Sequence, residues 1–212
     1  MKKTLYSILY MFLITFCFTA LVSGIRYLNQ EKIEQNMAMR RQAVILSALN
    51  ISSQKIDSAA LQMSLYNERI KQRQILDRDI YIGLDNEGQA ITGYAFSASG
   101  QGFWGPISCM IGISGDMTHL LGIVFYENTE TPGLGARITE DWFQKQFTGL
   151  SLKNKNSSGN FFTLSPAGSE KTSDDFDAIT GATGTSDAVE KFLNRELRLF
   201  INRIAPLLIK ET

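Results

Sequence analysis

The residues whose types and spacing could support chemistry lie in three glycine-rich segments, and the most suggestive is DAITGATGTS at residues 177–186. It places small residues and hydroxyl groups directly before a stretch with helical periodicity. At a helix N-terminus, unpaired N–H groups and the positive end of the helix dipole face the same space, so this segment could bind a phosphate group. The alternative is a plain helix cap with an extended loop. A Walker A loop is excluded, because no lysine follows the glycines at the required position.

The second segment is ETPGLG at residues 130–135. Pro132 and Gly133 suit the central positions of a type II turn, and a turn is one interpretation. The other is a ligand loop, because two glycines around Leu134 let the backbone approach a flat ligand while presenting one apolar side chain. The sequence leaves both interpretations open.

The third segment, GQGFWG at residues 100–105, matches the pattern G-x-G-x-x-G. A dinucleotide-binding fingerprint must open a helix, whereas the following residues 106–111 have the composition of a strand. We therefore expect a glycine-rich hairpin. Its tip could present Phe103 and Trp104 to a partner or a planar ligand.

The composition excludes several other classes of protein. The 212 residues include 21 Lys and Arg against 21 Asp and Glu, so no long-range field attracts nucleic acid. His119, Cys17 and Cys109 are too few for a zinc, iron–sulfur or haem site, and we expect no metal. A hydrolase that uses Thr183 or Ser186 is disfavoured, because the sequence suggests no acid to pair with His119.

The N-terminus carries an uncharged apolar stretch over residues 4–25 after Lys2 and Lys3. About 22 residues rise roughly 33 Å as a helix, which is enough to cross a bilayer core. We expect a retained transmembrane anchor at 1–27, with a cleaved signal peptide as the alternative. The flanking charges weakly favour a single-pass protein whose remaining residues lie outside the cytoplasm.

The periodicity that follows predicts helices and then a sheet. Helical spacing of apolar residues covers 30–50 and 58–76, so we expect a helical connector at 28–78 and one domain at 79–212. Strands are expected near residue 80 and in three further segments, with Asn86 to Gly88 as a turn. Those three segments are 91–96, 107–113 and 120–126.

The C-terminal half predicts further helices. Thr139 is expected to cap a helix whose Trp142, Phe143 and Phe147 pack on the sheet, and residues 161–164 form a short strand candidate. The last helix is expected to begin near Ser186 or Asp187 and to end or kink at Pro206. Its buried face should comprise Val189, Leu193, Leu197, Phe200 and Ile204. This order of elements predicts an α+β fold with a mainly antiparallel sheet flanked by helices.

Two of the segments together resemble a known family. Residues 177–183, DAITGAT, resemble the flavinylation motif D-x-x-[ST]-G-A-T, and residues 130–135 precede it at the family's approximate spacing. The pair is similar to the FMN-binding domain of the G subunit of Rnf complexes and of the C subunit of the sodium-translocating NADH:quinone reductase. The WGPI sequence at 104–107 looks more like the quinone-reductase branch, whereas the short chain fits the Rnf branch, so the branch stays open.

The resemblance implies a covalent cofactor and a function. FMN would be joined through its phosphate to Thr183 by a separate flavin transferase that recognises Asp177, and Thr131 and Leu134 would face the isoalloxazine ring. The other positions implied at the cofactor are Thr180, Gly181, Ala182, Thr185, Glu130, Gly133, Gly135 and Trp104. The implied function is electron transfer, with other subunits, in an ion-translocating oxidoreductase complex of the inner membrane, the domain lying on the periplasmic side. The alternative is a membrane-anchored binding or scaffold domain without a redox cofactor.

Overall fold

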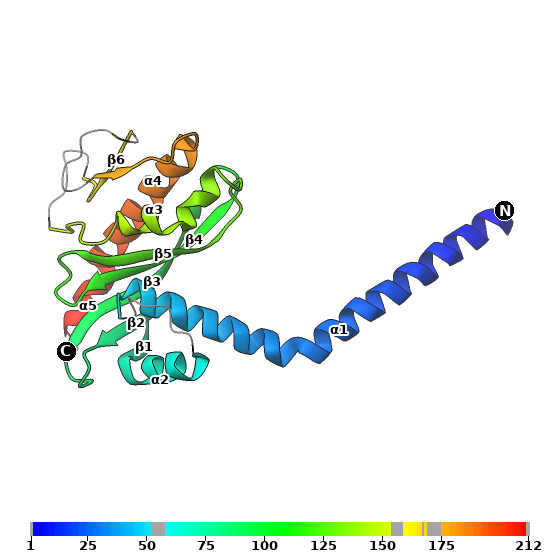
Figure 1. Cartoon of the computed structure of the whole chain (residues 1–212), viewed down its shortest axis with the longest axis horizontal. Helices are drawn as coiled ribbons and strands as arrows, with labels where there is room; N and C mark the ends of the chain where they lie inside the picture. The colour runs from blue at the N-terminus through cyan, green and yellow to red at the C-terminus, as the bar shows by residue number, and fades with distance from the viewer. Residues whose placement is uncertain (1, 52–57, 154–158, 167, 169–174, 211–212) are drawn as a thin grey trace. The chain divides into compact units, whose positions relative to one another are not determined.

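The computed structural model describes residues 2–51, 58–153, 159–166, 168 and 175–210 (Figure 1). Helix α1 (Lys2–Ala48) is continuous, and the chain divides into two compact units at residues 1–41 and 42–212. Within the first unit, α1 is long and apolar enough to cross a membrane. The apolar stretch at 4–25 and the periodic stretch that follows it lie on this one helix, because nothing between them stops a helix.

The second unit is built on an antiparallel sheet of five strands in the order β1-β2-β3-β4-β5. Each strand pairs with the one that follows it in the chain, as hairpin-like turns require. The strands are β1 (Ile70–Ile75), β2 (Arg78–Leu84), β3 (Ile91–Gln101), β4 (Pro106–Ser114) and β5 (Leu120–Asn128). The expected antiparallel sheet is confirmed. The helix expected at 58–76 was wrong in its second half, since α2 (Ala59–Arg69) ends where β1 begins.

The two faces of the sheet carry separate apolar cores, because successive side chains of a strand point to opposite faces. Ile80, Phe96 and Ile111 belong to the larger core, which includes the buried apolar side chains of α4 (Thr183–Leu199). Tyr81, Ala95 and Met110 belong to the smaller core. The smaller core is completed by Ile45, Leu46, Ala48 and Leu49 at the end of α1.

The end of α1 approaches the sheet backbone at a pair of glycines. Gly112 and Gly122 lie opposite each other on β4 and β5. A methyl group on Gly112 would lie 2.0 Å from the carbonyl oxygen of Ala48, and one on Gly122 would lie 3.2 Å from it. The missing side chains therefore admit the helix end.

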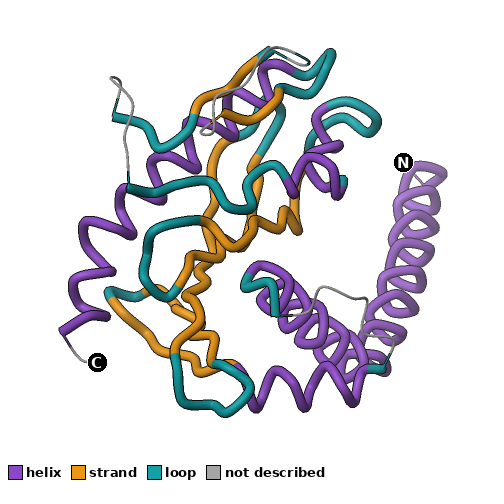
Figure 2. Tube along the Cα trace, turned by 60° about the vertical axis from the view of Figure 1, so that its left-hand side comes forward, coloured by secondary structure: helices purple, strands orange, loops and turns teal. Residues whose placement is uncertain are grey.

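The C-terminal elements are short up to α4. They are η1 (Gly135–Thr139), α3 (Asp141–Lys145), the parallel pair β6 (Thr163–Ser165) and β7 (Asp175–Asp177), α4, η2 (Phe200–Ile204) and α5 (Ala205–Lys210). Figure 2 shows α4 and its continuation as the purple helix that leads to the C-terminus. The five apolar residues expected on the buried face of the last helix are all buried.

Pro206 explains the irregular turn in this last helix. Proline has no N–H to donate to the carbonyl group of Asn202, four residues earlier. The residue before the proline, Ala205, donates its N–H to the carbonyl oxygen of Phe200, which is five residues back rather than four. The segment η2 is therefore a π-helical turn. The expected kink at Pro206 thus takes the form of a π-helical turn.

Candidate functional site

The segment 177–186 forms the turn between β7 and α4. Gly181 has φ +79°, a conformation that favours glycine, and Ala182 is the N-cap residue of α4. The side-chain hydroxyl of Ser186 accepts a hydrogen bond from Ile179 N (3.0 Å) and donates one to Ala182 O (3.1 Å). Ser186 therefore stabilises the turn from inside the helix.

The expected start of the last helix at Ser186 or Asp187 was wrong, because α4 begins at Thr183. Gly184 and Thr185 are weak helix formers, yet both are held by contacts from distant segments. A methyl group on Gly184 would lie 2.6 Å from Phe103 Cδ2, and the Thr185 hydroxyl is buried against Glu130. Tertiary contacts override the local preference here.

The three threonines of this segment differ in accessibility. Thr185 is buried, whereas Thr180 and Thr183 are exposed. Thr183 is the first residue of α4, where backbone N–H groups lack partners within the helix and the dipole is positive. None of the residues of the first turn is acidic.

The Glu130 carboxylate joins all three glycine-rich segments. It is 5% exposed. Its Oε2 accepts a hydrogen bond from Thr185 Oγ1 (2.7 Å), and its Oε1 accepts one from Trp104 N (3.0 Å). Glu130 thus links segment 130–135 to Trp104 and to Thr185. Sequence reasoning did not predict this linking role.

Two glycines leave room for this carboxylate. A methyl group on Gly102 would lie 2.5 Å from Glu130 Oε1, and one on Gly135 would lie 2.7 Å from Oε2 and 2.4 Å from Thr185 Oγ1. Both positions therefore need glycine for close approach. Gly135 is buried, which identifies it as part of the support of the site.

Residues 131–134 form the expected turn. Thr131 O accepts a hydrogen bond from Leu134 N (3.1 Å), and Gly133 has φ +75°. Leu134 is 44% exposed, and its Cδ2 atom would lie 3.3 Å from a methyl group on Gly181. The turn therefore presents Leu134 next to the 177–183 segment, as the ligand-loop interpretation requires.

The segment 100–105 is the hairpin between β3 and β4, closed by a hydrogen bond from Gly102 N to Gly105 O (2.8 Å). No helix follows it, so the dinucleotide fingerprint is excluded. At its tip Phe103 (61% exposed) and Trp104 (68% exposed) meet edge to face, with Phe103 against Gly184. Exposed apolar side chains thus lie against both neighbours of the 182–183 step, with Phe103 at Gly184 and Leu134 at Gly181.

Asp177 lies at the other end of the motif. Its backbone N–H donates to Gln146 Oε1 (2.8 Å). It borders a pocket of about 280 Å³ that is also lined by Arg137, Trp142, Ala178 and Thr180. No sequence pattern pointed to Arg137, and Trp142 was expected to pack on the sheet with Phe143 and Phe147. Those two phenylalanines are buried, whereas Trp142 is 40% exposed and meets Phe143 edge to face.

Glu140 organises the outer wall of that pocket. Arg137 Nε donates to both of its carboxylate oxygens (3.1 and 3.2 Å), and Trp142 Nε1 donates to Oε2. These hydrogen bonds lower the pKa of Glu140, chiefly through Arg137, so the carboxylate stays charged. Glu140 precedes α3 as its N-cap residue, whereas Thr139, the expected cap, donates its hydroxyl hydrogen to Ala136 O within η1.

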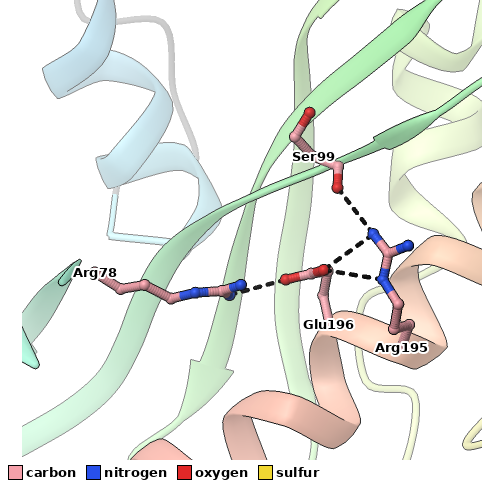
Figure 3. Close-up of polar contacts among 4 residues, drawn as sticks. All are labelled: Arg78, Ser99, Arg195 and Glu196. Carbon is pink, nitrogen blue, oxygen red and sulfur yellow. Dashed lines mark hydrogen bonds and ion pairs between the residues drawn. The ribbon is translucent and has the colours of Figure 1, made fainter. Parts of the chain in front are cut away.

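The position of α4 on the sheet is fixed by a buried carboxylate near its C-terminal end (Figure 3). Glu196 accepts from Arg78 on β2 (2.8 Å) and from Arg195 (3.1 Å), and Arg195 also donates to the carbonyl oxygen of Ser99 on β3 (3.2 Å). Burial raises the pKa of the Cys109 thiol, and the nearby Glu196 charge raises it further. This cluster holds the helix that carries Thr183.

Metal binding has no support in the part of the chain that the structure describes. Those residues contain no group of three His, Cys, Asp or Glu side chains that could hold an ion. His119 lies immediately before β5, where its backbone N–H donates to the Ser114 hydroxyl and its Nδ1 contacts the Thr118 hydroxyl. Ser114 and Thr118 also donate to the Asp116 carboxylate, so these hydroxyls stabilise the turn before β5.

Comparison with known proteins identifies a domain. Residues 102–198 match the family described as FMN-binding domain. The chain is 38% identical over 109 residues to the C subunit of the Na(+)-translocating NADH-quinone reductase of Chlamydia pneumoniae. It is 32% identical over 124 residues to the G subunit of the Na(+)-translocating ferredoxin:NAD(+) oxidoreductase complex of Acetobacterium woodii. These alignments cover 44% and 58% of this chain, but only 34% and 56% of the relatives' lengths.

Solved structures agree on the fold. The crystal structure of the C subunit of the Na(+)-translocating NADH-quinone reductase from Parabacteroides distasonis superposes with a TM-score of 0.65 at 24% identity, covering 81% of this chain and 94% of that one. NqrC of Shewanella oneidensis gives 0.60 at 16% identity, with coverages of 73% and 89%. The glycine-rich segments and α4 lie almost wholly within the matched region 102–198. The chain therefore carries a region that matches an FMN-binding domain, and it is similar to the C subunits of Na(+)-translocating NADH-quinone reductases and to the G subunits of ion-translocating oxidoreductase complexes.

Proposed function

We propose that this protein is a membrane-anchored electron carrier that holds FMN through a phosphoester bond to Thr183. The observation that carries the proposal is the exposed Thr183 at the first turn of α4, with exposed Phe103 against the adjacent Gly184 and exposed Leu134 against Gly181. The hydroxyl offers an attachment point, and the apolar side chains offer a surface for a flat ring.

The residues present suit the two chemically different ends of FMN. A phosphodiester at Thr183 would place its negative charge at the positive end of the α4 dipole, within reach of N–H groups that the helix leaves unbonded. The isoalloxazine ring would cover apolar surface that is otherwise exposed to water. FMN supplies the redox chemistry when bound, and the chain's residues bind and orient it.

Accessibility also supports Thr183 as the attached residue. The Thr185 hydroxyl already donates to Glu130 and is buried, so it could react only after that hydrogen bond is broken. Thr180 is exposed but lies in the turn before the helix, where it lacks the position of Thr183 at the helix terminus. Attachment by a flavin transferase that recognises Asp177 remains part of the proposal, since Asp177 borders a pocket beside the motif.

The setting that we propose is an ion-translocating oxidoreductase complex of the inner membrane, with this chain as one redox subunit. Relatives of both branches carry such names, and the branch stays open. Residues 1–27 would span the membrane, and residues 28–78 would connect this anchor to the domain at 79–212, which would bind FMN on the periplasmic side. The apolar part of α1 supports the anchor.

A labelling experiment tests this function. The full chain, produced with a flavin transferase and separated on a denaturing gel, should give a flavin-fluorescent band at its own mass. Thr183→Val should abolish that band, because the hydroxyl is lost, while the far-ultraviolet circular dichroism stays unchanged. The scaffold alternative predicts no fluorescent band from the parent. A flavin mapped by peptide mass spectrometry to Thr180 or Thr185 would contradict the assignment.

A further inference from the structure

The pocket beside Asp177 is left unexplained by covalent attachment at Thr183. Its volume of about 280 Å³ lies just below the range of roughly 300 to 1,000 Å³ that is typical of ligand pockets. It is therefore suited to one end of a ring system such as flavin and too small for a whole nucleotide. Its lining combines groups that donate hydrogen bonds with groups that accept them.

The donor wall is Arg137, and it is held in place before any ligand arrives. Its guanidinium carbon lies 5.3 Å from the centre of the Trp142 ring, and its Nε is fixed by Glu140. Among the described residues, Arg137 makes no other side-chain hydrogen bond. A guanidinium carries five N–H donors in a rigid plane, so the four on its terminal nitrogens stay available to a ligand.

The acceptor wall belongs to the motif itself. Asp177 and Thr180 line the same pocket as Arg137, and Ala178 of the same segment lines it as well. An ionised carboxylate only accepts hydrogen bonds, and a hydroxyl can accept or donate. A ligand that suits this lining must present acceptors toward Arg137 and a donor toward Asp177 or Thr180.

The pocket adjoins the position proposed for the flavin ring. Leu134 immediately precedes η1, and Arg137 N donates to Leu134 O (3.1 Å), which closes one 3₁₀ turn. Leu134 Cδ2 would lie 3.3 Å from a methyl group on Gly181, the residue that follows Thr180 of the pocket lining. A ring that contacts Leu134 therefore lies beside the segment that lines the pocket.

We propose that this pocket binds the pyrimidine end of the isoalloxazine ring. That end is an imide, in which an N–H lies between two carbonyl groups, and it matches the donor and acceptor walls. Arg137 would donate to a carbonyl oxygen, while Asp177 or Thr180 would accept from the N–H. The inference rests on the proposed function, since it requires FMN at Thr183.

The charges around the pocket fix the sign of the effect on the flavin potential. Arg137 is positive, Glu140 and Asp177 are negative, and Trp142 and Thr180 are neutral. Reduction adds negative charge to the ring, so Arg137 favours the reduced form. Arg137→Gln leaves both carboxylates without a cation in this pocket and should therefore lower the midpoint potential.

The test compares the parent, Arg137→Gln and Arg137→Lys, each as the full chain carrying covalent FMN. Arg203→Gln is the control, because Arg203 is an exposed arginine on η2, twenty residues beyond Thr183. Arg137→Gln should raise an infrared carbonyl stretching frequency of the oxidised flavin, since a hydrogen bond is lost. It should also reduce the equilibrium ratio of reduced to oxidised flavin about tenfold at a given potential, which corresponds to a fall in midpoint potential of about 59 mV for a one-electron step.

Arg137→Lys keeps the positive charge but lacks the planar guanidinium group. Its midpoint potential should therefore be close to the parent's, whereas its carbonyl stretching frequency should differ from the parent's. Arg203→Gln should match the parent in both. If Arg137→Gln keeps the parent's frequency and potential, the pocket does not bind the ring. If Arg137→Gln fails to become flavinylated while Arg137→Lys is labelled with the parent's carbonyl frequency, Arg137 serves attachment and the inference is wrong. A parent without flavin would refute the proposed function itself, a result distinct from both.

Discussion

The hydrogen bond between Thr185 and Glu130 should contribute measurably to stability, and Thr185→Val tests it. Valine has nearly the shape of threonine and the same branching at Cβ, so packing and helix propensity change little. The substitution removes the hydroxyl that donates to Glu130 Oε2 at 2.7 Å. It leaves a carboxylate that is 5% exposed with one hydrogen bond fewer.

The structure sets the size of this effect. A hydrogen bond to a charged group contributes about 1.5 to 3 kcal/mol to stability, and a buried acceptor without its donor retains its desolvation cost. We therefore expect Thr185→Val to lower the free energy of unfolding by about 2 kcal/mol. For a unit of this size, 1 kcal/mol corresponds to roughly 2 to 4 °C, so the melting temperature should fall by about 4 to 8 °C.

The assay is thermal unfolding of the full chain in detergent micelles, followed by circular dichroism. Thr183→Val is the matched control, because it makes the same chemical change two residues earlier at an exposed position and should stay within about 0.5 kcal/mol of the parent. Thr185→Ser should recover most of the loss, since it restores the donor. If Thr185→Val melts with the parent while remaining folded, Glu130 does not depend on Thr185, and our account of how the three segments are joined fails.

Three further predictions concern the site and its support. Asp177→Ala should slow attachment of FMN by the flavin transferase with little change in melting temperature; normal labelling kinetics would remove Asp177 from recognition. Leu134→Asp should lower the midpoint potential of the attached flavin in a spectroelectrochemical titration, because the new carboxylate repels the reduced ring. Gly133→Val should chiefly lower the melting temperature, because Gly133 has φ +75°. If both variants keep the parent's potential and stability, the turn does not contact the flavin. Gly112→Ala should cost about 1 to 3 kcal/mol in denaturant unfolding, because its methyl group would meet Ala48 O at 2.0 Å; a stability equal to the parent's would show that the helix end does not pack there.

Much of the fold could be predicted because its signals are local. Alternating apolar residues and turn sequences predicted β2 to β5, and the spacing from Val189 to Ile204 predicted the buried face of the last helix. The errors lie where a local signal was ambiguous. Ser186 is typical of a helix cap, but it serves from inside the helix by bonding Ala182 O. Leu65 and Ile70 fit one helical face, yet the chain changes to a strand at Ile70, where pairing with β2 begins.

The candidate site was predictable only as separate parts. Each glycine-rich segment has a plain structural interpretation as a hairpin, a turn or a cap. The hairpin and the turn are correct locally, whereas the residue expected to begin the helix, Ser186, lies inside α4. What the sequence does not contain is the contact that joins them, since Glu130 reaches Trp104 across 26 residues and Thr185 across 55. Arg137 was not identified, and Trp142 was assigned only to packing on the sheet, because their place in the pocket depends on lying beside Asp177 and Thr180.

The choice of a buried carboxylate for this junction bears on function. Burying a charge without an ion-pair partner costs desolvation free energy even when hydrogen bonds offset part of the loss. An apolar residue could pack between the three segments without that desolvation cost. A carboxylate whose two oxygens accept from two different segments does something that an apolar contact does not, because hydrogen bonds fix direction as well as distance. Such fixation has little use in a loose scaffold, whereas a carrier must keep Trp104, Leu134 and Thr183 in one arrangement around a bound ring. The geometry of Glu130 therefore favours the carrier over the scaffold.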